Sequence, residues 1–285
     1  MSRNAVLFLI LLALIVGGIS WYQYRYYRTP VVIPNNESHQ IMLGTAHKDD
    51  IPAIEEPAYE SVASADVYLN DAGYGMVVEV GSRARFYPFQ ILVWHEVVND
   101  TFNGRDLLVT FDPLTYTSVV YDRTDTFGVS GKIWNSNTLL YDHTTESLWS
   151  QLRGEAIEGE LAGTKLARVP LKVMTWATYK IEYPYGQVLS RETGFDRDYT
   201  QDPYDGYDET AAIWFALEQE DPRLAPKSLV FGVQRQGTTL VFPVDTLEEF
   251  DTIQAIIEES DVLVPSYWFA WAAMYPDSQI YSPNE

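Results

Sequence analysis

Short runs of β-branched and aromatic residues, each bounded by Gly, Asn, Asp or Pro, recur through most of this chain. Such runs are typical of β-strands, and amphipathic helical periodicity is scarce. We expect strands at GMVVEV (75–80), ARFY (84–87), LLVTF (107–111), TSVVYD (117–122) and LLYD (139–142), and helices at TWATYKIEY (175–183), TLEEFDTIQAIIEE (246–259) and SYWFAWAAMY (266–275). The pattern therefore predicts a mainly β protein with a few helices, a β-rich α+β fold.

Two of these elements occur twice in the same order. The segments GMVVEVGSRARFYPF (75–89) and LVFGVQRQGTTLVFPV (229–244) both have the pattern of strand, Gly-containing turn, strand and aromatic-Pro pair. Each is followed, further along, by a helical segment that ends in Tyr-Pro, and proline should stop these helices at Pro184 and Pro276. The recurrence indicates an internal duplication of a hairpin-helix unit, unless the two hairpins are alike only because all hairpins are.

Composition limits the classes of function. The chain has 285 residues, of which 46% are hydrophobic, and this is enough for a well-buried core. Its 40 acidic and 19 basic residues give a net charge of −21, which repels phosphate backbones, so we expect no nucleic-acid partner. The chain has no cysteine, which excludes disulfides, thiolate nucleophiles and cysteine-ligated metals. It also lacks a P-loop, a dinucleotide-binding glycine motif and a G-x-S-x-G elbow.

The first 28 residues have the pattern of a single-pass membrane anchor. The uncharged run from Ala5 to Trp21 just reaches the length of a membrane-spanning helix, and YQYRYYR follows it with interfacial tyrosines and arginines. A cleaved signal peptide is the alternative, but no A-x-A site closes the run. We expect an anchor at 1–28, a proline-containing tether at 29–50 and one β-rich domain with two related halves at 51–285, outside the cytoplasm. The expected partner is thus the membrane.

Long stretches of the body resemble one protein family. From about Ile51 to Tyr281 the chain is similar to members of the domain-of-unknown-function family 3179 (DUF3179), and the segments that carry the resemblance occur in the same order. They include IPAIEEPAY, YPFQILVWHEVVNDT, FGVSGKIWNSN, ESLWSQLRGEAIEGELAGT, LSRETGFDRDYTQDPYDGY and FAWAAMYP. The resemblance supplies no established activity.

The resemblance does draw attention to one turn, in LLVTFDPLTYTSV (107–119). Family members typically carry Cys-Pro-Leu-Cys there, sometimes with selenocysteine, which implies a redox dithiol. This chain has Asp112, Pro113, Leu114 and Thr115 at the matching positions. Since neither a carboxylate nor a hydroxyl can perform thiol–disulfide exchange, we expect this member to lack that reaction. We expect Asp112 and Thr115 to occupy a partly enclosed pocket near His95 and Trp149.

Three groups of polar residues are candidate sites. His95 and Glu96 could join Asp112 and Thr115 as catalytic residues, or as metal ligands, although a histidine bonded to the backbone is the simpler interpretation. The acidic loop GFDRDYTQDPYDGYDE (194–209) could bind calcium, but its spacing is not that of an EF-hand, and Asx turns also explain it. A third group could bind a small polar ligand such as a sugar, or could fill the core. The calcium candidates are Asp196, Asp198, Asp202 and Asp205, and the ligand candidates are Trp134, Asn135, Asn137, Trp149 and Gln151.

Two functions fit these features. The first is a membrane-anchored extracytoplasmic binding or structural module, a relative of a redox family that has lost its thiols. The alternative is an enzyme that uses a His95/Glu96/Asp112 pocket, with or without a divalent metal. The sequence identifies no cofactor and leaves open whether the protein is an enzyme.

Overall fold

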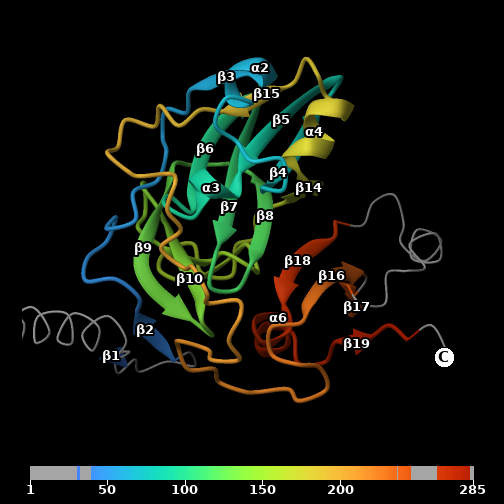
Figure 1. The fold of residues 1–285 in the computed structure, drawn as a ribbon. Coiled ribbons are helices and arrows are strands. Elements are labelled where there is room, and N and C mark those ends of the chain that lie inside the picture. Colours follow the sequence, from blue (N-terminus) through green and yellow to red (C-terminus); the bar gives the residue numbers. More distant parts are fainter. Residues whose placement is uncertain (1–30, 33–39, 236, 245–261, 283–285) are drawn as a thin grey trace, which may run out of the picture.

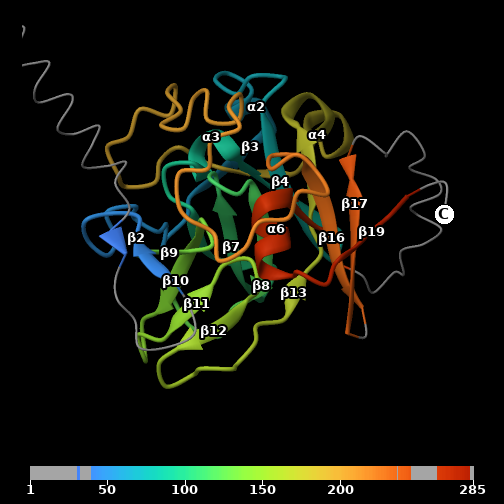
Figure 2. The same ribbon diagram turned by 90° about the horizontal axis from the view of Figure 1, so that it is seen from below.

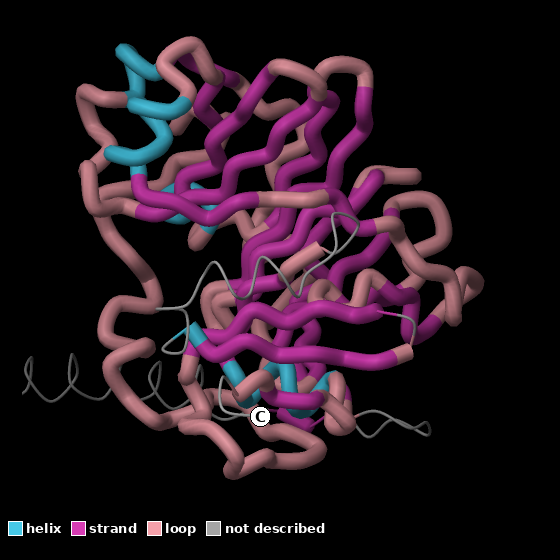
Figure 3. The backbone as a smooth tube through the Cα atoms, turned by 90° about the vertical axis from the view of Figure 1, so that its right-hand side faces the viewer, coloured by secondary structure: helices cyan, strands magenta, loops and turns pink. Residues whose placement is uncertain are grey.

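The computed structural model describes residues 31–32, 40–235, 237–244 and 262–282, and most of their regular structure is β-strand. Figure 1 shows the strands arranged in several sheets, and Figure 3 shows that the helices between them are short. The structure thus confirms the predicted β-rich α+β class. The described helices are α2 (Val62–Ala65), α3 (Phe89–Leu92), α4 (Trp176–Glu182) and α6 (Trp268–Met274).

Two sheets form the centre of the body. One has the order β13-β8-β7-β6 and the other has the order β1-β2-β9-β10-β11-β12. The first contains β6 (Val97–Phe102), β7 (Arg105–Asp112), β8 (Thr117–Asp122) and β13 (Arg168–Val169). The second contains β1 (Val31–Val32), β2 (Ile41–Leu43), β9 (Phe127–Trp134), β10 (Asn137–Asp142), β11 (Leu148–Ser150) and β12 (Glu155–Glu158).

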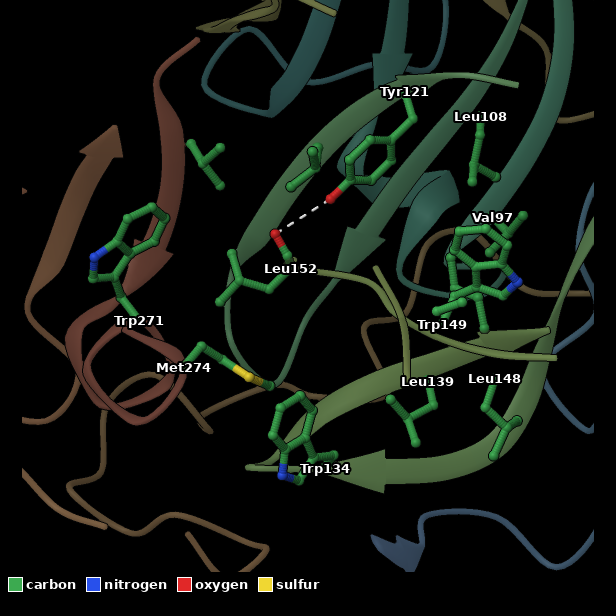
Figure 4. Close-up of a cluster of buried hydrophobic side chains, with 14 of the residues drawn as sticks. Val97, Leu108, Tyr121, Trp134, Leu139, Leu148, Trp149, Leu152, Trp271 and Met274 are labelled. Atoms are coloured by element: carbon green, nitrogen blue, oxygen red, sulfur yellow. Dashed lines mark hydrogen bonds between the residues drawn. The ribbon is translucent and has the colours of Figure 1, made fainter. Parts of the chain in front are cut away.

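The core lies between these sheets and α6. Leu108 and Val97 from the first sheet pack in one hydrophobic cluster with Leu139 from the second and with Trp271 of α6 (Figure 4). Polar atoms inside the cluster are bonded, since the Tyr121 hydroxyl donates to the carbonyl oxygen of Leu152 at 3.2 Å (Figure 4). Complete burial of such large side chains supplies most of the stabilisation of this centre.

Two peripheral units share one topology. The first has the order β14-β4-β5-β15, extended by β3, and the second has the order β18-β16-β17-β19. In each unit an antiparallel hairpin is flanked by an antiparallel strand that precedes a helix and by a parallel strand that follows the helix. The strands are β3 (Tyr59–Ser61), β4 (Tyr74–Val80), β5 (Arg83–Pro88), β14 (Lys172–Thr175), β15 (Gln187–Leu189), β16 (Leu229–Arg235), β17 (Thr238–Pro243), β18 (Val264–Tyr267) and β19 (Gln279–Ile280).

The pairing register of the two units also agrees. Pro88 lies opposite Gly75 in the first hairpin and Pro243 lies opposite Val230 in the second. Helices α4 and α6 both end one residue before a tyrosine that precedes proline, as proline requires. Both hairpins and both helix ends that the sequence predicts are therefore present, in matching settings.

The two units differ in how their helices pack. All seven residues of α6 are buried, whereas α4 buries only Trp176 and Tyr179. Figures 1 and 2 show α4 at the rim of the molecule, and Figure 2 shows α6 near the centre of the view. At Gly232 a Cβ would lie only 2.1 Å from the Trp271 ring, so the absent side chain lets α6 approach its sheet closely.

Three sequence predictions about chain segments need comment. The expected anchor lies outside the described residues, and within the described ranges no helix is long and apolar enough to span a membrane. The expected helix at 246–259 also lies wholly outside them. The expected tether is described at Val31–Val32, which form β1, and from Gln40 to Asp50, where Ile41–Leu43 form β2, which pairs with β1 and β9. Burial of Ile41 and Met42 makes this segment part of the body.

Candidate functional site

The turn between β7 and β8 holds Asp112 at the end of a buried strand. The two strands pair antiparallel with Asp112 opposite Thr117, as the strand-turn-strand pattern predicts. Asp112 Oδ1 accepts a hydrogen bond from the Leu114 backbone N–H at 2.9 Å, which makes an Asx turn. The Asp112 side chain is buried, so its carboxyl faces the interior and not solvent.

The β9–β10 hairpin of the other central sheet holds the second oxygen of Asp112. Asp112 Oδ2 accepts hydrogen bonds from Asn137 Nδ2 and from the Thr138 backbone N–H, both at 2.8 Å. The hairpin turn is Asn135-Ser136, whose φ angles of 51° and 63° are those of a two-residue type I′ turn. This tight turn places the first residues of β10 against the Asp112 turn, so two sheets together fix the carboxyl.

Glu96 lies beside Asp112 in an unusual backbone conformation. After α3 the chain reverses at Glu96, whose N–H donates to the Leu92 carbonyl at 2.7 Å with a φ of 57°. This left-handed position after a helix normally carries Gly or Asn, because a Cβ there costs about 1–2 kcal/mol. The Glu96 carbonyl accepts from the Phe111 N–H at 2.9 Å, which aligns Glu96 with the end of β7.

The two carboxyl groups are buried without a cation. Burial raises the pKa of Asp112 to about 6, against the opposing effect of its hydrogen bonds. Burial, and secondly the charge of Asp112, raise the pKa of Glu96 well above its ordinary value. In the described part of the chain no Lys, Arg or His forms an ion pair with either group. Both carboxyl groups therefore keep their protons to a higher pH than exposed carboxyl groups do.

Glu96 also has an open hydrogen-bonding position. The Thr138 and Tyr204 side chains hydrogen-bond to its carboxyl group. Its Oε2 atom is buried and has no hydrogen-bond partner among the described residues. Buried polar atoms are nearly always bonded, so an orphaned carboxyl oxygen requires an explanation. A ligand that bonds to Oε2 would supply the missing partner.

Glu96 and Asp112 both line a cavity of about 380 Å³. Its walls come from residues 44–51, from β9 and from the long loop 190–228 between β15 and β16. At Gly131 a Cβ would lie 2.5 Å from Thr45 Oγ1, so the glycine lets the N-terminal wall pack on β9. The other lining residues are Gly44, Ile51, Leu114, Val129, Lys132, Ile133, Thr138, Pro203, Tyr204, Trp214 and Phe215. The cavity is thus mostly apolar, with its polar groups gathered at the two acids.

Two larger hollows lack these features. One of about 600 Å³ lies between the start of β5 and the end of α4, and one of about 770 Å³ surrounds residues 220–226. No polar side chain in the lining of either is buried. Since a specific site needs polar groups held in place within an apolar setting, the carboxylate cavity is the better candidate.

His95 lies apart from this cavity although it neighbours Glu96 in sequence. Its Nδ1 is 2.8 Å from the Pro52 carbonyl oxygen and its Nε2 is 2.6 Å from the Tyr199 hydroxyl. Burial lowers the pKa of His95, so the ring is neutral. Both ring nitrogens have hydrogen-bond partners within the protein. The structure therefore brings together Glu96 and Asp112, and places His95 in a separate hydrogen-bonded setting.

Thr115 is buried beneath the turn and does not line the cavity. Its hydroxyl lies 2.8 Å from Thr117 Oγ1 and accepts from Asn137 Nδ2 at 3.1 Å. Because Asn137 Nδ2 also donates to Asp112, the side chains of positions 112 and 115 converge on one atom. This convergence is what a pair of cysteines at the two positions would require.

The expected polar ligand surface is not formed. All five residues proposed for it are at most 3% exposed, and none lines the cavity. Gln151 Nε2 donates to Thr110 Oγ1 at 2.8 Å, and the indole nitrogens of Trp134 and Trp149 each donate to a carboxylate at 2.9 Å. Trp134, Asn137 and Trp149 lie in β9, β10 and β11, whereas Asn135 is in the β9–β10 turn and Gln151 follows β11. All five side chains are buried, and Asn137 donates to Asp112.

The calcium candidates form local turns. Asp198 accepts from the Thr200 N–H at 3.0 Å, and Asp202 accepts from the Tyr204 N–H at 2.8 Å. Asp196 and Asp205 are exposed. Within the described ranges no group of three His, Cys, Asp or Glu side chains could hold a metal ion. The geometry of this loop is thus that of Asx turns.

Sequence reasoning missed most of the cavity wall. Tyr204 belongs to the acidic loop that the sequence flagged for its aspartates, yet it is the tyrosine that reaches Glu96. Trp214 and Phe215 follow in the same loop, far in sequence from the β7–β8 turn. Their aromatic character was the only available signal, and it does not distinguish a cavity wall from core packing.

Fold and site together define a β-rich domain with one small cavity closed over two buried carboxyl groups. The family model described as a protein of unknown function (DUF3179) matches residues 48–265. Because this match covers more than half of the chain, the chain belongs to the DUF3179 family. No curated protein and no solved structure matches it.

Proposed function

We propose that the domain is a small-molecule-binding module that the N-terminal segment holds at a membrane, outside the cytoplasm. One observation carries the binding part of the proposal: an orphaned, buried carboxyl oxygen of Glu96 lines a largely apolar cavity. Cavities of this size, with a few fixed polar groups in apolar walls, are the usual form of small-ligand sites. The ligand must offer hydrogen-bond donors or acceptors to Glu96 and Asp112 and an apolar part to Trp214 and Phe215.

A fragment screen tests this binding function. Protein-observed NMR with a fragment library should shift resonances of Glu96, Tyr204 and Trp214 for several compounds. Glu96→Gln should weaken most of these responses at least tenfold, because it replaces one carboxyl oxygen by an amide nitrogen. The control Glu192→Gln makes the same substitution at an exposed position and should leave them unchanged. A screen in which no fragment shifts these residues contradicts the proposal.

Enzymatic activity is the second candidate, and one observation favours it. Two adjacent carboxyl groups whose environments give them different pKa values can act as a general acid and a general base. Glu96 would then donate a proton and Asp112 would accept one. A compound recovered unchanged after prolonged incubation with the protein supports the binding module, whereas conversion that Glu96→Gln abolishes supports the enzyme.

The membrane location rests on the sequence of the first 28 residues. The uncharged Ala5-to-Trp21 run and the aromatic, basic segment after it support an uncleaved anchor. Full-length protein should need detergent for extraction, and a protein that begins at Thr29, which keeps β1 and β2, should be soluble. Uncleaved full-length protein in a salt-washed soluble fraction would exclude the anchor.

A further inference from the structure

Neither acid of the carboxylate cavity forms an ion pair with a cation of the described residues. Elsewhere in the molecule the fold supplies such charges itself, but the groups that influence the Glu96 and Asp112 carboxyls are Thr138, Thr115, Leu114 and Tyr204, with no cation among them. The ionisable groups near the pair are Tyr204 and Tyr207 and, on the cavity wall, Lys132. The Lys132 side chain forms no ion pair with either acid.

We propose that the ligand of this cavity is a monovalent organic ammonium, whose N–H groups donate to Glu96 Oε2 and to Asp112. This inference rests on the proposed binding function and names its ligand class. The proton balance is simple: the neutral Glu96 carboxyl and the free ammonium become a carboxylate–ammonium pair, and one proton passes to the buffer. No bond to carbon changes.

The shape of the site agrees with an ammonium that carries an apolar group. Glu96 and Asp112 mark one region of the cavity, and Tyr204, Trp214 and Phe215 give it aromatic walls. Aromatic faces attract cations, and the attraction is larger where water is excluded. The protein already uses this contact with its own ammonium group, since Lys227 Nζ lies 3.3 Å from the centre of the Tyr207 ring.

The charge around the cavity also favours a cation. Tyr204 is shared with a neighbouring hollow of about 320 Å³, whose lining includes Asp202, Asp205 and Asp208 and no Lys, Arg or His. These three aspartates are exposed, and the whole chain carries a net charge of −21. Such a field raises the local concentration of cations and repels anions.

Three isosteric probes test the inference: benzylammonium, benzyl alcohol and benzoate. Calorimetric titration in buffers of different ionisation enthalpy measures both the affinity and the number of protons released. Benzylammonium should bind and should release up to about one proton. Because the ligand competes with that proton, its affinity should rise by up to about tenfold for each pH unit above about pH 6, as long as binding still releases a proton. Benzoate should not bind.

Two variants test whether benzylammonium binding and proton release take place at Glu96. Glu96→Gln should abolish the proton release and weaken benzylammonium at least tenfold, whereas Glu192→Gln should match the parent protein. Binding of benzyl alcohol or benzoate without benzylammonium overturns the ammonium class and leaves the binding function standing. Binding of benzylammonium without proton release, or with equal affinity for Glu96→Gln, also overturns the inference. Failure of the binding function itself is seen separately, as a fragment screen with no response at the cavity.

Discussion

Strand β6 has a buried acid near each end, and the fold treats the two differently. At Asp100 the protein supplies its own cation: Arg85 Nη1 lies 2.6 Å from both carboxylate oxygens, and the Tyr87 hydroxyl donates at 2.5 Å. At Glu96, just before β6, no cation is in contact and one oxygen has no partner in the described structure. A fold that can neutralise a buried acid internally, and does so a few residues away, leaves Glu96 open for a group from outside.

The Arg85 guanidinium is also fixed on its other sides. It lies 3.7 Å from the centre of the Tyr59 ring and 4.2 Å from that of Phe102, and its Nε donates to Gln187 Oε1 at 3.0 Å. All of these partners belong to the described body. The Asp100 carboxylate is therefore paired within the protein and has a structural role, while the Tyr59 hydroxyl beside Arg85 is buried without a partner among the described residues.

The largest change in stability should come from breaking the Arg85–Asp100 ion pair. Arg85→Met leaves the Asp100 charge buried without its cation, which should lower the free energy of unfolding by about 3–5 kcal/mol. Urea denaturation followed by tryptophan fluorescence measures the change. The double variant Arg85→Met with Asp100→Asn should recover much of the loss. If Arg85→Met were as stable as the parent, Asp100 would not depend on its cation, and the contrast between Asp100 and Glu96 would be lost.

Asp112 should show an intermediate effect. Its two oxygens accept from three donors, the Leu114 and Thr138 N–H groups and Asn137 Nδ2. Asp112→Asn turns one acceptor into a donor and leaves at least one buried donor unpaired, so we expect a loss of about 1–3 kcal/mol. The exposed Asp205→Asn is the matched control and should be neutral in the same assay. A neutral Asp112→Asn would mean that these donors do not hold the carboxyl.

Substitution of Glu96 should change the stability least, and it should stabilise the protein rather than destabilise it. The pKa values of Glu96 and Asp112 are raised in the folded protein, so their contribution to stability is complete below about pH 4 and is lost as the pH rises through about 6 and beyond. Glu96→Gln removes the carboxyl group whose ionisation burial opposes, so it should raise the free energy of unfolding at neutral pH, by less than the two losses above. Denaturation between about pH 4 and pH 8 should give a flatter stability profile than the parent gives. A destabilised Glu96→Gln with an unchanged profile contradicts this expectation.

The elements that depend on local chemistry were the ones the sequence predicted well. The strand-turn-strand at Asp112 was recognisable because Asp-Pro breaks an apolar run, and α4 and α6 were recognisable from the Tyr-Pro pairs that end them. Strand β9 was missed because FGVSGKIW mixes Gly, Ser and Lys with its apolar residues. Buried on both faces, it lacks the alternation that identifies a half-exposed strand.

The site was predicted in part. Glu96 and Asp112 were both candidates, but nothing local shows that the chain reversal at Glu96 points its carboxyl toward Asp112 and leaves His95 facing Tyr199. The missing cation is a still less local property. Lys132 of β9 lines the cavity, yet no Arg or Lys of the described residues forms an ion pair with either acid, and a single sequence does not show which cations will pair with an acid.

The claim that Glu96 and Asp112 are buried without a cation is tested most directly by titration of the two carboxyl groups. Carbon-13 NMR of protein labelled at the side-chain carboxyls, with Glu96→Gln and Asp112→Asn to assign the signals, should give Asp112 a pKa near 6 and Glu96 a pKa well above its ordinary value. Addition of benzylammonium should lower the pKa of Glu96. Ordinary pKa values for both groups, unaffected by benzylammonium, would contradict the claim that Glu96 and Asp112 form an unpaired acid site that awaits a cation.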